Sequence, residues 1–169
     1  MSSSELLNVL DKNGNFAGVA SREECHSGAF FLHEVIHVLV FNSKGELLLQ
    51  KRSRNKDIQP GKWDTSVGGH VSASETPEES LIRESEEELG IINASFKKIY
   101  SYIMTNNIEK ESVTTYICTW DGVITHQEEE IEDIRFFKTD EIENLLGKGF
   151  FTPNFEEEWQ CYKKWVKKI

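Results

Sequence analysis

The chain has 169 residues, of which 38% are hydrophobic and 28% are charged, a composition typical of one soluble globular domain and unlike that of a disordered chain. Its formal net charge of −10 disfavours binding to DNA or RNA, because proteins meet the phosphate backbone with basic patches. The sequence contains neither an apolar run as long as a membrane span nor the pattern of a secretory leader. We therefore expect a cytoplasmic protein that binds neither a nucleic-acid polymer nor a membrane.

The predicted elements alternate between strands and a few helices. Residues 6–10 and 16–20 flank a turn with Asn13-Gly14, which predicts an N-terminal hairpin, and residues 35–41 and 46–52 predict a second one around residues 42–45. Runs of β-branched and aromatic residues predict further strands over residues 63–67, 96–104, 113–120 and 131–137. Helical periodicity predicts helices over residues 77–89, 139–146 and 155–166.

No repeat, linker or low-complexity tract divides these elements. We expect one α/β (α+β) domain over residues 1–169 with a mixed central sheet. Its parts are the hairpin at residues 5–20, a core at about 32–150 and a C-terminal helix at 155–167. The three cysteines are far apart and lack C-x-x-C spacing, so neither a disulfide framework nor a thiolate zinc site is indicated.

The helix predicted over residues 77–89 has well-marked ends. Thr76 can cap its N-terminus, Pro77 suits the first helical position, and Glu79 completes a capping box with Thr76. Gly90 can adopt the left-handed conformation that ends a helix.

Three carboxylates fall within one arc of this helix. Glu84, Glu87 and Glu88 share that arc, and the neighbouring arc, expected to face the core, holds Leu81, Ile82, Ser85 and Leu89. Like charges at these spacings repel, so we expect a cation among them, and hard oxygen ligands suit Mg²⁺ or Mn²⁺. Taken alone, the three residues are equally consistent with an acidic helix facing solvent.

The wider sequence around this helix resembles the Nudix box, G-x5-E-x7-R-E-U-x-E-E-x-G-U. Gly69, Glu75, the run from Arg83 to Leu89, Gly90 and Ile91 match it, and the departures are Ser85 in place of an aliphatic residue and Ser74 in place of a frequent glycine. The resemblance implies an α/β/α sandwich in which the box forms a loop-helix-loop. It also implies that Glu84, Glu87 and Glu88 hold Mg²⁺ or Mn²⁺, that Arg83 orients the catalytic carboxylate, and that Glu75, Gly69 and Gly90 shape the loops.

A second resemblance extends over about residues 5–155, to the type I isopentenyl-diphosphate isomerases, a branch of the Nudix fold. The residues that carry it are Leu32-His33, Val40-Phe41-Asn42, Leu47 to Arg52, Pro60 to Trp63 and Ser66 to His70. It implies a second metal site, suited to a transition metal, formed by His26, His33, His70, Glu109 and Glu111. It also implies a diphosphate clamp of Arg22, Arg52 and Lys56, and a catalytic role for Glu111. The alternative for each histidine alone is an ordinary surface or core residue.

Two departures separate the chain from the isomerases. Gly68 stands where isomerases have an acid/base cysteine, and Asn154 stands where they have an aromatic residue. We therefore predict a magnesium-dependent Nudix diphosphatase (pyrophosphohydrolase) acting on a small molecule, either a nucleoside diphosphate derivative or another organic diphosphate. An isomerase-like enzyme and a catalytically silent ligand-binding module remain as alternatives. The run Glu128 to Glu130 is interpreted as a solvated loop, and the oligomeric state is left open, a homodimer included.

Overall fold

A computed structural model of the chain describes residues 5–56 and 58–169. Its sheet is centred on β3 (Leu32–Phe41), an apolar strand buried along most of its length. β3 pairs in parallel with β8 (Lys110–Thr119) over its whole length and antiparallel with β6 (Val67–His70). β7 (Lys97–Thr105) extends the sheet beyond β8, and the hairpin of β1 (Leu6–Leu10) and β2 (Phe16–Ser21) pairs with the start of β3.

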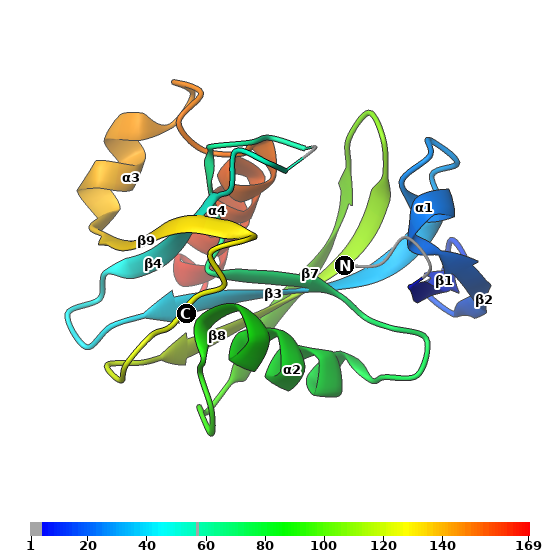
Figure 1. Cartoon of the computed structure of the whole chain (residues 1–169), viewed down its shortest axis with the longest axis horizontal. Helices are drawn as coiled ribbons and strands as arrows, with labels where there is room; N and C mark the ends of the chain where they lie inside the picture. The colour runs from blue at the N-terminus through cyan, green and yellow to red at the C-terminus, as the bar shows by residue number, and fades with distance from the viewer. Residues whose placement is uncertain (1–4, 57) are drawn as a thin grey trace.

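A second group of strands diverges from β3 (Figure 1). β4 (Leu47–Arg52) lies between β5 (Trp63–Asp64) and β9 (Ile131–Phe137), and its one pair with β3 is Phe41 with Leu47. Ser66 ties the two groups together, because its hydroxyl donates to the carbonyl of Leu48 and accepts from the amide of Val40. The space between the diverging strands is where a cavity can form.

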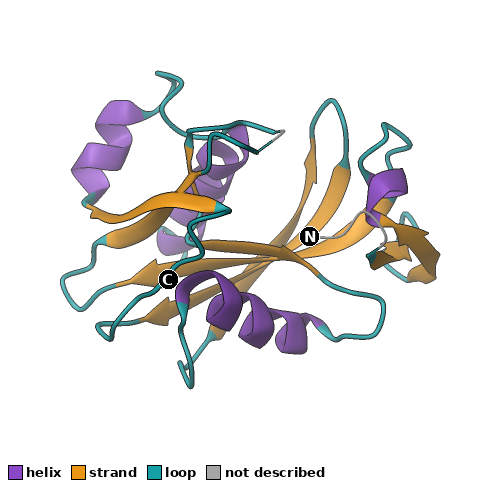
Figure 2. Ribbon diagram, viewed as in Figure 1, coloured by secondary structure: helices purple, strands orange, loops and turns teal. Residues whose placement is uncertain are grey.

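Helices cover both faces of the mixed sheet, so the molecule is an α/β/α sandwich (Figure 2). α2 (Pro77–Leu89) packs on one face, where Leu81 and Leu89 meet Ile36 and Val38 of β3. α3 (Thr139–Leu145) and α4 (Pro153–Val166) pack on the other, where the core includes Leu39, Phe137, Ile142, Phe155 and Trp159. Successive residues of β3 pack into the two cores on opposite faces of the sheet, because side chains alternate along a strand.

The structure confirms the mixed sheet, the N-terminal hairpin and the helix bounds 77–89, and it corrects three details. The strand expected over residues 63–67 is two strands, β5 and β6, interrupted at Thr65 and Ser66. A short helix, α1 (Arg22–Cys25), was not predicted, although Ser21 and Glu24 form a capping box that marks it. Ile82, expected to face the core, is 58% exposed.

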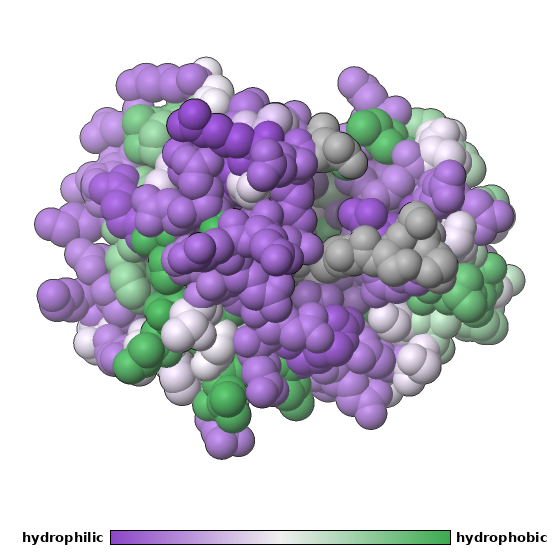
Figure 3. All heavy atoms as spheres, viewed as in Figure 1, coloured by the Kyte–Doolittle hydropathy of each residue, from purple (hydrophilic) through white to green (hydrophobic). Residues whose placement is uncertain are grey.

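The visible surface is mainly hydrophilic, as the net charge leads one to expect (Figure 3). Apolar side chains gather at the end of the molecule formed by β1 and β2, where Leu6, Phe16 and Val19 are exposed. Among the described residues, no helix is both long and apolar enough to cross a bilayer.

Candidate functional site

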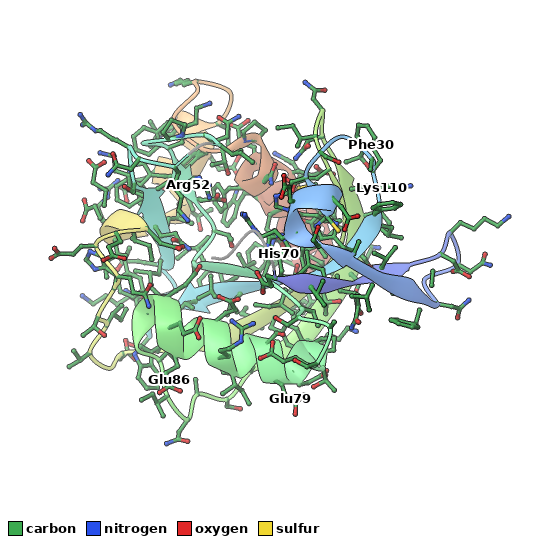
Figure 4. All side chains as sticks on the ribbon, turned by 45° about the vertical axis from the view of Figure 1, so that its right-hand side comes forward. Phe30, Arg52, His70, Glu79, Glu86 and Lys110 are labelled. Carbon is green, nitrogen blue, oxygen red and sulfur yellow. The ribbon has the colours of Figure 1, made fainter. Side chains whose placement is uncertain are left out.

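The caps of α2 form as the local sequence predicts. The Thr76 hydroxyl accepts from the amide of Glu79, whose carboxylate accepts from the amide of Thr76 at 2.8 Å. Gly90 ends the helix with a φ of 64°. These local bonds fix where the helix begins and ends, and Figure 4 shows Glu79 and Glu86 on the outer side of the helix.

Arg83, in the middle of α2, is the centre of an ion-pair cluster. Its Nε and Nη2 atoms donate to the two carboxylate oxygens of Glu75 at 2.7 and 2.8 Å, a bidentate pair. Its Nη1 atom donates to Glu84 at 2.8 Å and to Glu87 at 3.3 Å. The hydrogen bonds from Arg83 lower the pKa of Glu75 to about 2. Arg83 therefore fixes the loop before α2 and two carboxylates of α2 at once.

Glu84 is buried against the sheet, at 1% exposed, rather than on a solvated helix face. Burial raises its pKa to about 7, and Arg83 opposes that shift. A Cβ atom at Gly69 would overlap the Glu84 side chain. Glu84 can therefore occupy this position only because residue 69 has no side chain. Gly69 and Glu84, which lie 15 positions apart in the motif, thus pack directly against each other.

The other two carboxylates of the predicted triad have different surroundings. Glu88 is partly buried and accepts from Gln50 Nε2 at 3.0 Å and from the amide of Gly68 at 3.4 Å. Burial raises its pKa to about 8. Glu87 is the exposed member, with 52% of its side chain accessible. The three carboxylates of this arc therefore differ in exposure, because the packing of α2 on the sheet buries Glu84 and leaves Glu87 exposed.

A cluster of histidines and acids lies across the sheet edge from α2. His26, His33, His70 and Glu111 each offer a ligand atom within 4.8 Å of every other, which makes the four a candidate metal-binding set. Glu109 lies outside that set, but its carboxylate is 3.0 Å from His26 Nε2. The structure thus brings together four of the five residues expected here and places the fifth beside them.

Strand register explains this convergence. His33 on β3 is directly opposite Glu111 on the parallel strand β8, and His70 on β6 is opposite Val35, two residues from His33 on the same face. His26 follows α1, and the amide of Gly28 donates to the carbonyl of Ile108, which ties this segment to the β7–β8 turn.

The electrostatics of the cluster suit a bound cation. His33 Nδ1 donates to the carbonyl of Phe31 at 2.9 Å, and its buried Nε2 has no hydrogen-bond partner within the described chain. His70 Nδ1 is likewise buried and unpaired among these residues. Burial lowers the pKa of all three histidines, and burial, then Glu109, raises that of Glu111 to about 8. Neutral imidazoles are the form that ligates metals.

The predicted clamp residues line one cavity of about 410 Å³ together with Glu88 of α2 and members of the histidine cluster. Arg52 Nη1 lies 3.3 Å from Asp64, Lys56 donates to Glu130 at 2.8 Å, and the Nε atom of Arg22 is buried without a hydrogen-bond partner in the described residues. The cavity also contains Gln50, Gly68, His70, Glu88, Glu111 and Asn154 in its lining. Figure 4 shows Arg52 and His70 on separate strands of this region.

Sequence reasoning missed other residues of the same cavity. Glu130, interpreted as part of a solvated loop, lines it, as do Asp64 and His37. His37 has the same strand parity as His33, a signal that was available from the sequence. Glu158, which bonds His37, interrupts the apolar stripe of α4, but its role is visible only once the helix is docked.

Comparisons with known proteins support the motif assignment. The family model described as "NUDIX domain" matches residues 31–158. An uncharacterized Nudix hydrolase of Listeria monocytogenes is 38% identical over 129 residues, covering 73% of this chain and 74% of the relative. An isopentenyl-diphosphate Delta-isomerase of Photorhabdus laumondii is 27% identical over 159 residues, covering 89% and 90%. The crystal structure of DR0079 from Deinococcus radiodurans superposes with a TM-score of 0.81 at 23% identity, covering 94% of this chain and 99% of that one, which shows a shared fold.

Proposed function

The chain belongs to the Nudix family, and we propose that it is a magnesium-dependent hydrolase of a diphosphate linkage in a nucleoside diphosphate derivative or another small organic diphosphate. One observation carries the proposal. Arg83 holds Glu75, Glu84 and Glu87 in one ion-pair cluster, while Glu88 extends from the same helix into a cavity with three basic side chains.

Each part of this arrangement has a proposed role. Glu84, Glu87 and Glu88 bind the divalent cation, with Mn²⁺ as a substitute for Mg²⁺, and Arg83 positions Glu84 and Glu87 through its two Nη1 contacts. Arg22, Arg52 and Lys56 bind the diphosphate oxygens. When bound, the cation would neutralise phosphate charge and make a water molecule easier to deprotonate.

The burial of Glu84 and Glu88 supports a cation at this place. Two carboxylates with a pKa near neutrality lie close enough for the charge of one to raise the pKa of the other. A cation between them would offset both the repulsion and the cost of burial. Glu87 is exposed and bonded to Arg83 at 3.3 Å, so a small side-chain rotation would bring it to that cation.

The second candidate function is isomerisation of an isoprenoid diphosphate with Glu111 as the acid/base. It is favoured by the convergence of His26, His33, His70 and Glu111 and by the relative of that name. Gly68 argues against it, because this residue lines the cavity and has no group that can transfer a proton.

A screen of purified protein decides between these functions. The panel contains nucleotide sugars, dinucleotides, nucleoside triphosphates and isopentenyl diphosphate, each with and without Mg²⁺ or Mn²⁺. We expect metal-stimulated release of phosphorylated products from at least one nucleotide-type diphosphate and no dimethylallyl product from isopentenyl diphosphate. Isomer formation without hydrolysis would favour the second function. The absence of metal-stimulated turnover would indicate a ligand-binding module.

A further inference from the structure

A carboxylate is buried behind the cavity, on the side away from α2. Glu158 on α4 is fully buried, and four side chains donate hydrogen bonds to it. His37 Nδ1 and the hydroxyl of Tyr102 donate to Oε2, both at 2.7 Å. The hydroxyls of Tyr100 and Thr115 donate to Oε1 at 2.5 and 3.0 Å.

Four donors hold Glu158 in its ionised form. A protonated carboxyl would have to donate one hydrogen bond, which would require one of these four donors to turn and accept instead. Burial acts to raise the pKa of Glu158, but the hydrogen bonds, that of His37 foremost, outweigh burial and lower it. The fixed anion in turn determines the state of His37, whose Nδ1 must carry a proton.

The opposite edge of the His37 ring faces the cavity. The side chain is 9% exposed, and that exposed part lines the cavity, whereas Tyr100, Tyr102 and Thr115 do not line it. Gly68 lies over this edge: a Cβ atom there would be 3.5 Å from His37 Cδ2 and 3.7 Å from His37 Nε2. A side chain at residue 68 would therefore cover this edge of the ring, and glycine does not.

The charge of the ring follows from its surroundings. Burial lowers the pKa of His37, but the hydrogen bond and the charge of Glu158, with smaller contributions from Glu111 and Asp64, reverse that shift and raise it. A ring that donates from Nδ1 to a carboxylate and carries a second proton on Nε2 presents a cationic donor to the cavity. No other described member of the Glu158 cluster can supply such a donor there.

We propose that His37, held by Glu158, binds an anionic oxygen of the diphosphate through its Nε2–H and is a substrate-binding residue that the sequence motifs do not mark. This inference rests on the proposed function, since it deepens the description of the same cavity. Arg52 on β4, Lys56 in the loop after it and Arg22 at the start of α1 supply positive charge to the cavity, and His37 supplies it beside Gly68.

His37→Asn separates this role from a structural one. An asparagine amide can replace Nδ1 in the hydrogen bond to Glu158 but leaves nothing at the place of Nε2. A purely structural His37 therefore predicts a nearly normal variant. We expect instead that the variant, with Mg²⁺ present, binds methylenediphosphonate about ten- to a hundredfold more weakly in calorimetry, the range for losing a hydrogen bond to a charged group. For a substrate found in the screen, KM should rise more than kcat falls.

The matched control is His126→Asn, a change in the β8–β9 loop outside the cavity, which should bind the diphosphonate like the wild type. In the wild-type protein, the ¹⁵N resonance of His37 Nε2 should shift on titration with methylenediphosphonate, while that of His126 should not. This measurement does not depend on whether the variant folds.

The proposal is overturned if the wild type binds methylenediphosphonate without a change at His37 Nε2, if it does not bind this probe at millimolar concentration, or if a folded His37→Asn variant binds it as tightly as the wild type. Failure of the proposed function would look different. The wild type would then hydrolyse none of the panel, and the diphosphonate titration would still test the contact with His37.

Discussion

At the scale of single residues, three glutamates of similar sequence context have three environments. Glu84 is buried beside Gly69, Glu88 bonds Gln50 at the cavity, and Glu87 is half exposed. Substitution of each glutamate should therefore change stability by a different amount, even though we assign all three to one cation. Glu87 is the member whose function can be tested with least effect on the fold.

Glu87→Gln should lose metal-dependent hydrolysis and keep the fold. The change removes one charged oxygen ligand from an exposed position, so we expect kcat to fall by roughly 10²-fold or more while stability changes by no more than about 0.5 kcal/mol. Steady-state kinetics and thermal unfolding measure both. Glu86→Gln, on the outer side of the same helix, is the matched control and should keep wild-type turnover. Normal turnover by Glu87→Gln would remove this residue from the proposed site.

Glu75 should make stability sensitive to acid. Its pKa is about 2 in the folded protein, because Arg83 donates to both of its oxygens, compared with an ordinary value of 4.5. Between these values the unfolded chain binds a proton that the folded chain does not. The stabilisation is therefore complete above about pH 4.5 and is lost as the pH falls through about 2.

Glu75→Gln tests this linkage, because the amide cannot ionise. The variant should be less stable than the wild type at neutral pH, and the difference between their melting temperatures should shrink as the pH falls from 4.5 toward 2. Melting curves at several pH values measure the difference. A constant difference over that window would contradict the assigned ion pair.

At the scale of elements, α2 is defined by its own caps, but its end is also packed against a distant loop. Gly90 has a φ of 64°, and a Cβ atom there would overlap the hydroxyl of Thr125. The glycine of the motif therefore meets two requirements, a left-handed backbone and a close neighbour. The carboxylates of α2 depend on this end because Glu87 and Glu88 lie in the last turn.

Gly90→Ala should destabilise the protein by more than backbone strain alone. Gly149→Ala is the matched control, since Gly149 has a φ of 72° and open space around its Cα. We expect the control to cost about 1–2 kcal/mol, the strain of a left-handed non-glycine residue, and Gly90→Ala to cost more. Urea unfolding measures both. If Thr125→Ala does not restore part of the loss in the Gly90 variant, the close contact is not its cause.

At the scale of the whole molecule, one cavity joins two candidate cation sites of different chemistry. The carboxylates of α2 offer oxygen, whereas His26, His33 and His70 offer nitrogen beside Glu111. Different ligand types select different metals, so Mg²⁺ at α2 and a transition metal at the histidines could be bound together. Gly68 and Gly69 separate the two sites.

Protein loaded with Mn²⁺ or Zn²⁺ and then desalted should retain metal, and the His33→Ala and His70→Ala variants should lose it. Metal analysis measures the content, with His126→Ala as the control outside the cluster. Because burial lowers the pKa of the cluster histidines below the ordinary 6.5, protons should compete with the metal only below that value. A wild type that retains no metal would leave the carboxylate site as the sole candidate.

The sequence by itself determined the features that depend on neighbours along the chain. The caps of α2, the hairpin β1–β2 and the spacing from Gly69 to Ile91 are local, so turn chemistry and periodicity were enough to predict them. The family resemblance also pointed to the histidine cluster, although it placed Glu109 within the ligand set and the structure places it beside the set, 3.0 Å from His26.

Only the tertiary structure decided what depends on contacts between distant segments. His37 and Glu158 are 121 positions apart and meet because α4 docks on the face of β3 that carries the odd-numbered residues. The burial of Glu84, the exposure of Ile82 and the entry of Glu130 into the cavity depend on how α2 and a loop sit against the sheet. A helix period gives the relative angles of side chains around one axis, but the rotation of that axis against its neighbours is set by packing.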